Sequence, residues 1–343
     1  SIKMRRDNDI EKFFKGKTEV PQFNYSISTQ ARKLQNQLTK PPGSLGKLEE
    51  LATWMAGWQG EINPTVKTPY CLIFAGNHGI ACKGVSAYPP EVTAQMVENF
   101  KKGGAAINQL CGLADVDLFI IPLDLEKPTR DFSEGIAMEK QEVISAMQLG
   151  FESVPSDCDL LVLGEMGISN TSSATAISCA LFNEAVESMT GIGTGLNKEQ
   201  LSNKISIIKS ALQLHGRKFE DTISILSCYG GREIAAIVGS VIAARIMSVP
   251  VLLDGFVCTA AASSLLIFDK KLLDHCLISH LSTEPGHLKI LNYLKKEPIL
   301  DLKMRLGEGS GAAVASLILK SALATHNGMS TFSDAKVAKK INL

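Results

Sequence analysis

Residues 159–173 read DLLVLGEMGISNTSS, and their pattern indicates the class of fold. A short, mostly apolar run ends in glycine at residue 164, and the polar residues that follow open a longer helical pattern. A buried strand that turns through glycines into a helix is typical of parallel sheets, whose strands are covered on both faces. Similar apolar runs recur at 70–76, 116–121, 224–230, 249–255 and 276–282. The sequence therefore predicts an α/β fold with a parallel sheet of six strands and helices on both faces.

Composition excludes several classes of protein. The 343 residues suffice for one large domain and a smaller piece. Lys+Arg and Asp+Glu both number 35, so there is no basic excess to displace counterions from nucleic acid. No apolar run approaches the ~20 residues that cross a bilayer, and the polar first stretch lacks an apolar signal core. We expect a cytoplasmic enzyme without a nucleic-acid or membrane partner.

The eight cysteines are scattered and form no CxxC pair. In a chain of this size, that pattern favours reduced thiols in a cytosol over a disulfide framework. It also argues against a structural zinc site, and we expect no bound metal.

Both ends of the chain read as helical. Residues 27–60 show helical spacing that is interrupted at PPGSLGK (41–47), which predicts two helices around a turn. The segment RLGEGSGAAVASLILKSALA (305–324) predicts a glycine-rich turn that leads into an apolar helix. We expect residues 1–65 and 305–343 to form a small helical domain beside a large domain at 66–304. The alternative is that the last helix is only part of the main core.

Polar segments follow the six predicted strands: NHG, PLD, EMGISNTS, GREI, FVCT and TEPGH. In parallel sheets, ligands bind beyond the carboxyl ends of the strands. These segments therefore predict one site that is assembled from many loops.

Two glycine turns are candidate phosphate sites. Asn170 and Thr171 open a helix after GEMG, and free amides at a helix N-terminus suit an anion. The turn GIGTGLN (191–197) precedes another helix that carries Lys204. Ordinary helix capping by serine and threonine explains the first turn equally well. Neither turn matches a P-loop or a dinucleotide fingerprint, which disfavours ATP hydrolysis and NAD binding.

Glu308 stands between glycines in RLGEGSG, where no neighbouring side chain obstructs a ligand. Apolar surroundings would raise its pKa and make it a general base near neutral pH. The alternative is an acid that is placed at a helix start by the macrodipole. Asp254 and Glu284 follow other strands and are plausible ligands of ribose hydroxyls.

The segment NHGIACKGVSAYPPEVTAQMVENF (77–100) predicts a long loop in which Ser86, Tyr88 and Gln95 line an aromatic pocket. His78 is a candidate catalytic residue, although a histidine after a strand more often has a structural role.

Taken together, the chain resembles the nicotinate-nucleotide–dimethylbenzimidazole phosphoribosyltransferase family. The matching segments lie in order from residue 40 to residue 313: KPPGSLGKLEELA, AGNHGIACKGVSAYPPEVTAQMVENF, GEMGISNT, GTGL, GGREIAAIVGS, PVLLDGFVCTAAA, STEPGH and RLGEGSGAA. The resemblance implies a dimer with a Rossmann-like sheet and a small helical domain from both termini. It implies transfer of phosphoribose from nicotinate mononucleotide to dimethylbenzimidazole or a related aromatic base, with inversion and without a cofactor.

The resemblance also implies roles for individual residues. Glu308 would be the general base and Glu165 the second acid of the site. The donor and its phosphate would be bound by Gly167, Asn170, Thr171, Gly193, Thr194, Gly195, Lys204, Gly255 and Ser282. The acceptor ring would lie near Ser86, Tyr88, Gln95, Met166 and Leu306.

Three residues depart from the family pattern. Ser169 stands where glycine is expected, Arg232 where an aromatic residue is expected, and Leu281 where arginine is common. They leave open a paralogue that uses phenol or p-cresol, works within a heterodimer, or serves as a non-catalytic subunit. A phosphoribosyltransferase that uses a diphosphate donor is a further rival, but LLDGFVCT has one acid and no TGGT-like run.

Overall fold

The computed structural model describes residues 9–193 and 195–339. Its centre is one sheet of six parallel strands in the order β2-β1-β3-β4-β5-β6. The strands are β1 (Pro69–Ala75), β2 (Asp117–Pro122), β3 (Leu160–Met166), β4 (Val251–Leu253), β5 (Cys276–His280) and β6 (Pro298–Leu300). The predicted α/β class, the parallel sheet and the number of strands are confirmed.

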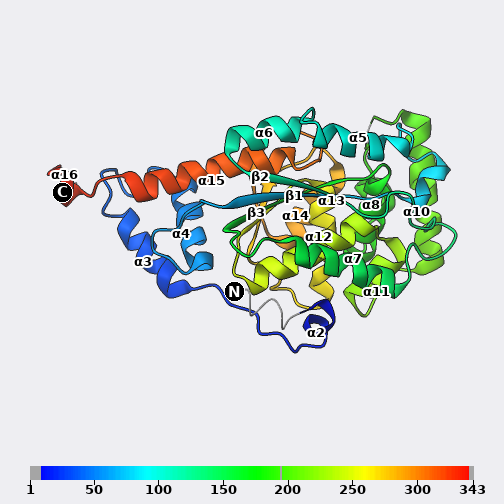
Figure 1. The fold of residues 1–343 in the computed structure, drawn as a ribbon, viewed down its shortest axis with the longest axis horizontal. Helices are drawn as coiled ribbons and strands as arrows, with labels where there is room; N and C mark the ends of the chain where they lie inside the picture. Colours follow the sequence, from blue (N-terminus) through cyan, green and yellow to red (C-terminus); the bar gives the residue numbers. More distant parts are fainter. Residues whose placement is uncertain (1–8, 194, 340–343) are drawn as a thin grey trace.

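Helices cover both faces of the sheet (Figure 1). Within the described residues, the helices are α2 (Ile10–Phe14), α3 (Tyr25–Gln35), α4 (Lys47–Gln59), α5 (Glu91–Lys101), α6 (Ala106–Ala114), α7 (Lys140–Ser153), α8 (Asn170–Phe182), α9 (Val186–Met189), α10 (Lys198–His215), α11 (Thr222–Tyr229), α12 (Arg232–Ile246), α13 (Phe256–Ser263), α14 (Pro285–Leu294), α15 (Ser310–Gly328) and α16 (Phe332–Ala335), with 3-10 turns η1 (Gly79–Lys83) and η2 (Ser264–Ile267). None of the described helices is long and apolar enough to span a membrane.

Alternation along the strands builds a separate apolar core on each face. In β3, Leu161 and Leu163 point into the core under α7, α12 and α13, whereas Leu160 and Val162 point into the core under α5, α6 and α15. Successive side chains of a strand point to opposite faces, so a strand buried on both faces is apolar throughout. This burial is why the sequence shows continuous apolar runs.

One predicted strand is wrong. The run SILSCYG (224–230) lies in helix α11 and not in the sheet. The side chain of Asp221 accepts a hydrogen bond from the backbone N–H of Ser224 and caps the helix. Ile225, Leu226 and Tyr229 are buried at helical spacing. The sixth strand is instead β6, a half-buried edge strand of three residues that lacks a long apolar run.

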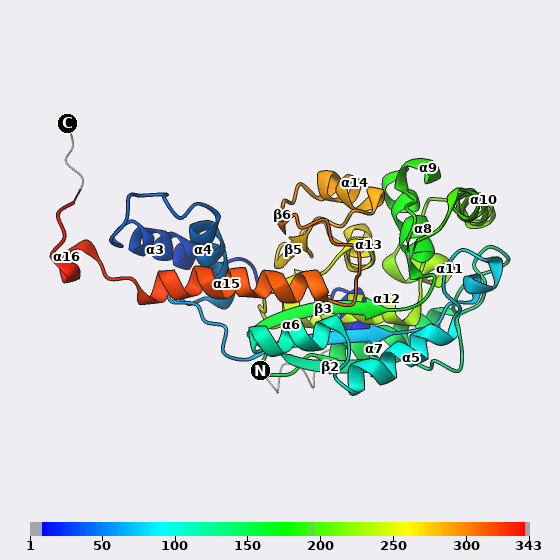
Figure 2. The same cartoon turned by 90° about the horizontal axis from the view of Figure 1, so that it is seen from above.

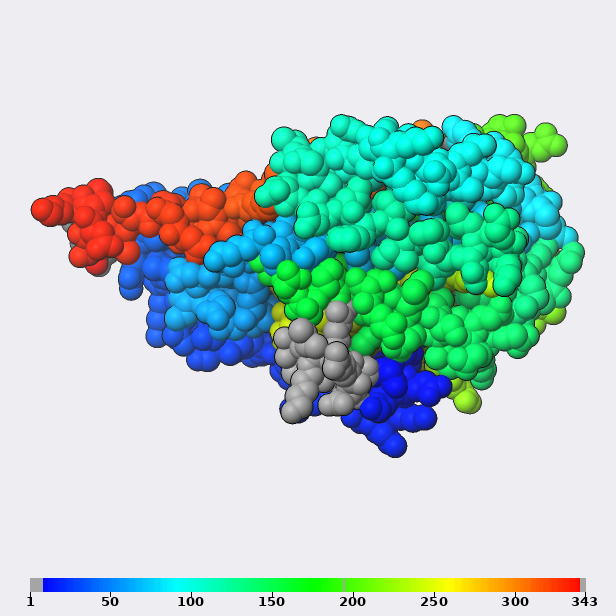
Figure 3. Space-filling view, viewed as in Figure 1, coloured from blue at the N-terminus to red at the C-terminus, as the bar shows by residue number. Residues whose placement is uncertain are grey.

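The predicted helices at both ends are confirmed as α3, α4 and α15. Helix α15 starts on the sheet and projects beyond it, and α3 and α4 lie beside its far end (Figure 2, Figure 3). There, His326 lies 2.8 Å from the Gln35 side-chain nitrogen and 2.8 Å from the Ile62 carbonyl. Helix α2 instead packs against α7, where the Ile10 N–H donates to Gln148. The division into domains at residues 66 and 305 stays a prediction.

Candidate active site

A cavity of about 700 Å³ lies at the carboxyl edge of the sheet. It opens next to strands β1 and β3, where the chain order of the strands reverses, which is the usual ligand site of open parallel sheets. The loops after β1, β3, β4, β5 and β6 all contribute. Its lining comprises Tyr88, Val92, Met96, Glu165, Met166, Gly167, Ile168, Asn170, Thr171, Gly193, Gly255, Phe256, Val257, His280, Ser282, Glu284, Met304, Arg305, Leu306, Gly307 and Glu308.

Most of the residues predicted for the site line this cavity. They are Glu165, Glu308, Gly167, Asn170, Thr171, Gly193, Gly255, Ser282, Tyr88, Met166 and Leu306. Ser86, Gln95, Gly195 and Lys204 are not among the lining residues, and Thr194 lies outside the described residues. Gln95 is exposed on α5, whereas the Ser86 hydroxyl accepts the backbone N–H of Tyr88.

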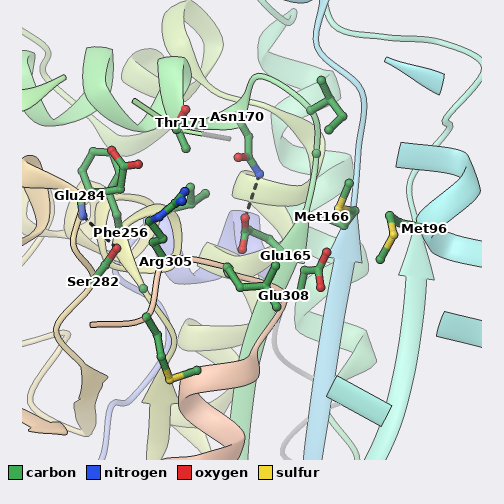
Figure 4. Close-up of a pocket in the computed structure, with 18 of the residues that line it drawn as sticks. Met96, Glu165, Met166, Asn170, Thr171, Phe256, Ser282, Glu284, Arg305 and Glu308 are labelled. Atoms are coloured by element: carbon green, nitrogen blue, oxygen red, sulfur yellow. Dashed lines mark hydrogen bonds between the residues drawn. The ribbon is translucent and has the colours of Figure 1, made fainter. Parts of the chain in front are cut away.

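The turn between β3 and α8 places an acid and a helix N-terminus in the cavity. Gly167 has no room for a side chain, because a Cβ atom there would lie 2.5 Å from a carboxylate oxygen of Glu233. Asn170 then begins α8 and donates a 3.1 Å hydrogen bond to Glu165 (Figure 4). Asn170 and Thr171 at this helix start both line the cavity, and a helix N-terminus favours an anion.

Glu165 is buried, with 8% of its surface exposed. Burial and then the negative charge of Asp254 raise the pKa of Glu165 well above its ordinary value. Burial thus favours the protonated form of Glu165, in which the carboxyl group can donate a hydrogen bond.

Glu308 lies in an unusual turn before α15. Its backbone has a φ of 60°, between Gly307 at 77° and Gly309 at 78°. The left-handed region is costly for residues other than glycine and is often found at functional sites. Burial and then the charge of Asp254 raise the pKa of Glu308 to about 7. A carboxyl group with this pKa is suited to accept a proton near neutral pH.

Asp254 is fully buried behind these two acids and does not line the cavity. Its oxygens accept backbone N–H groups of Gly309 at 3.0 Å and of Ala312 at 3.1 Å. Nε2 of His280 lies 3.4 Å from one of them. The interpretation of Asp254 as a ribose ligand therefore has no support in its placement. The other such candidate, Glu284, does line the cavity.

One side of the cavity is polar. Thr171, Ser282, Glu284 and Arg305 gather there (Figure 4). Behind them, the buried Nζ of Lys204 donates to the Thr171 hydroxyl at 2.8 Å. Burial lowers the pKa of Lys204 to about 8. Lys204 thus contacts the lining residue Thr171 and does not itself line the cavity.

The opposite side is apolar. Met96 and Met166 lie there, and the carboxyl groups of Glu165 and Glu308 lie between the two sides (Figure 4). Val92 and Ile168 also line the cavity and belong to the same apolar cluster as Met96 and Met166. Methionine is flexible and polarisable, and it packs well against aromatic rings. This side suits a flat aromatic group.

The sequence did not identify several lining residues as part of the site. They are Val92, Met96, Ile168, Phe256, Val257, His280, Met304, Arg305 and Gly307. The signal that could have identified His280 is its position as the last residue of β5, directly before the loop that lines the cavity. Met96 follows the predicted Gln95 by one residue, and helical geometry turns it toward the cavity. His78 has the structural role that was the simpler interpretation: its Nε2 lies 2.8 Å from both carboxylate oxygens of buried Glu233.

The three departures from the family pattern lie outside the cavity lining. Ser169 is the N-cap of α8 with φ of 77°. Arg232 donates to the Lys127 carbonyl and to Glu142. Leu281 pairs through its backbone N–H with the carbonyl of Leu300 on β6.

Comparison with known proteins assigns the family. A family profile described as "Phosphoribosyltransferase" matches residues 20–337. A protein of Jannaschia sp. named nicotinate-nucleotide–dimethylbenzimidazole phosphoribosyltransferase is 51% identical over 302 residues, which cover 88% of this chain and 90% of the relative. A protein of the same name from Cereibacter sphaeroides is 48% identical over 320 residues, covering 93% and 95%.

A solved structure agrees. The crystal structure of nicotinate-nucleotide–dimethylbenzimidazole phosphoribosyltransferase from Thermus thermophilus matches with a TM-score of 0.86 and 34% identity. The match covers 92% of this chain and all of that one. The similarity therefore extends over the sheet, the cavity and most of both ends.

Proposed function

The chain belongs to the nicotinate-nucleotide–dimethylbenzimidazole phosphoribosyltransferase family, and on that premise we propose the reaction that it catalyses. It transfers the 5-phosphoribosyl group of nicotinate mononucleotide to 5,6-dimethylbenzimidazole or a related aromatic base. The products are the α-riboside 5′-phosphate of the base and nicotinate. The observation that carries this proposal is the position of Glu308, a buried acid with a pKa of about 7, between a methionine-lined side and a polar side of one cavity.

The polar side suits the donor. Helix α8 begins at Asn170 and α13 at Phe256, so two helix N-termini present amides and positive dipole ends to a phosphate. Arg305 adds a cation at the same side. Lys204 would hold the Thr171 hydroxyl in place, and the nearby Gly193 backbone has a φ of 53°. Ser282 and Glu284 offer groups for ribose hydroxyls.

The apolar side suits the acceptor ring, which would lie against Met96 and Met166. The free ring nitrogen attacks C1′ of the ribose from the face opposite nicotinate, which inverts the anomeric centre. The C1′–N bond to nicotinate breaks, and its electron pair neutralises the pyridinium ring. The proton on the other acceptor nitrogen becomes acidic as the new bond forms, and ionised Glu308 accepts it. Binding both rings in one cavity supplies the remaining acceleration through proximity.

Glu165 has a different role in this scheme. Burial and the charge of Asp254 favour its protonated form, in which Glu165 would donate a hydrogen bond to the reacting groups. Two neighbouring acids with different pKa values can thus divide the roles of base and donor.

We propose dimethylbenzimidazole over a phenol as the acceptor. None of Ser169, Arg232 and Leu281 touches the cavity, so the departures that raised the phenolic alternative do not alter its lining. We also propose that the chain acts as a homodimer in the cytoplasm, which the family resemblance supports. Light scattering of the purified chain tests the dimer directly.

The test of function uses the purified chain alone. It receives nicotinate mononucleotide with equal dimethylbenzimidazole and p-cresol, and products are identified by mass spectrometry. We expect the benzimidazole riboside phosphate, with or without EDTA, and no product from phosphoribosyl diphosphate. Product that appears only after a second subunit is added would favour the heterodimer. Strict dependence on Mg²⁺ and phosphoribosyl diphosphate would instead favour the rival class of transferase.

A further inference from the structure

We propose that Asp254 is a positioning residue of this site. It directly follows strand β4, caps the N-terminus of helix α15 and thereby holds Glu308 in its reactive orientation. The inference rests on the proposed function for the role of Glu308 as base. The contacts themselves stand independently of that function.

Helix α15 cannot cap its own N-terminus. Its N-cap is Gly309, which has no side chain, and no residue within the helix start supplies a cap hydrogen bond. The first N–H groups of a helix have no partner inside the helix. Asp254, which follows β4, accepts hydrogen bonds from two backbone N–H groups at this end of the helix, those of Gly309 and Ala312. A carboxylate is also favoured there by the helix dipole.

These two hydrogen bonds fix the backbone around Glu308. The N–H of Gly309 belongs to the peptide unit that directly follows Glu308, so holding it restrains the ψ angle of Glu308. The other bond anchors the first turn of α15. Glu308 lies in a left-handed conformation that residues with a side chain seldom adopt, so its backbone needs such a restraint. Close packing of Gly309 also restrains this turn, because a Cβ atom on Gly309 would lie 2.8 Å from the Ile73 side chain.

Asp254 is fully buried, and both of its oxygens are engaged by backbone N–H groups. It therefore acts on the reaction through Glu308 and not by contact with substrate. Its negative charge adds to the effect of burial on Glu308. Removing that charge should lower the pKa of Glu308 toward its ordinary range. The other charged or titratable groups around Asp254 and Glu308 are Glu165, Glu233, Arg305, His280, His287, Cys71 and Cys258.

The decisive variant is Asp254→Asn. Asparagine has the same shape, but its NH₂ group would face one of the two N–H donors, so one hydrogen bond and the charge are lost. We expect kcat to fall by about 10- to 100-fold, since a small misplacement of a catalytic group has effects of this size. KM for the donor should change little. The acidic limb of the kcat profile should move to lower pH. Infrared difference spectra against Glu308→Gln should show Glu308 titrating at lower pH as well.

Asp159→Asn is the matched control. Asp159 also accepts two backbone N–H groups, those of Lys67 and Thr68, but it precedes β3 at the amino edge of the sheet, away from the cavity. This variant should lose stability without moving the pH profile. If Asp254→Asn keeps the wild-type kcat, or loses kcat with the acidic limb unmoved as in the control, Asp254 has no positioning role.

Amide hydrogen exchange on the wild-type protein tests the same contacts without a variant. We expect the amides of Gly309 and Ala312 to be strongly protected. Exchange as fast as at exposed Leu302 would overturn the proposal, even if Asp254→Asn fails to fold. If the wild-type chain makes no riboside phosphate, the proposed function fails. The infrared titration and the exchange rates then still decide whether Asp254 holds Glu308.

Discussion

The raised pKa of Glu308 predicts how activity depends on pH. With a pKa of about 7, the ionised fraction of Glu308 rises from about one tenth at pH 6 to about nine tenths at pH 8. Because only the ionised form accepts a proton, kcat should rise about tenfold over this interval. Glu308→Gln should lower kcat by about 10²-fold or more and flatten this pH dependence, while donor binding changes little.

The same pKa predicts a cost in stability. Below pH 4.5 the carboxyl is protonated in both the folded and the unfolded chain, so it contributes no difference. As pH rises from 4.5 to about 7, the unfolded chain releases the proton first and the free energy of unfolding falls. The full cost above pH 7 is about 3 kcal/mol, at 1.36 kcal/mol for each pKa unit. Glu308→Gln should therefore stabilise the protein by up to about 3 kcal/mol at pH 8 and by little near pH 4.5.

Steady-state kinetics from pH 5.5 to 8.5 and urea unfolding at pH 5 and pH 8 measure both effects on the same two proteins. The combination is diagnostic, because a merely structural acid would lose stability when it is replaced. A flat wild-type profile between pH 6 and 8, or a Glu308→Gln variant that is less stable at pH 8, would refute the reasoning.

Two further predictions concern residues behind the cavity. Ser169→Gly should raise the free energy of unfolding by about 1 kcal/mol and leave kcat unchanged, because Ser169 has φ of 77° and lies outside the cavity lining. Thermal unfolding measures this, and a destabilised variant would show that the Ser169 hydroxyl matters more than its backbone. Lys204→Met should raise the donor KM about tenfold or more with a smaller effect on kcat, since an ammonium that orders a phosphate site acts mainly on binding. The wild-type donor KM should also rise above pH 8, as the ammonium form of Lys204 is lost, and the variant should lack this rise. Lys209→Met on the exposed face of α10 is the control, and equal KM effects in both variants would contradict the assignment.

The sheet and the position of the site could be predicted because strong local signals agreed with the topology. Apolar runs such as 70–76 and 159–164 are buried on both faces in β1 and β3. The rule that ligands bind beyond the carboxyl ends of parallel strands then placed Glu165 and Ser282 at one edge. Both do line the cavity.

Other features could not be predicted, because they depend on packing between distant segments. A short apolar run is compatible with a buried helix as well as a strand, and for 224–230 the cap at Asp221 favours the helix. The edge strand β6 pairs with β5 although its own sequence is only three residues long. Likewise, nothing local shows that Lys204 lies behind Thr171, 33 residues earlier in the chain.

The start of the two site helices explains why a departure from the family pattern can leave the site intact. The N-cap of α8 is Ser169 with φ of 77° and ψ of 6°, and the N-cap of α15 is Gly309 with φ of 78° and ψ of 1°. The two turns thus have the same backbone, one with serine and one with glycine. Serine bears a steric cost of about 1 kcal/mol at such a position, which a buried core of this size readily offsets. Helix α8 therefore begins at the cavity after a serine turn, as it would after a glycine turn. For this reason Ser169 should affect stability and not the choice of acceptor.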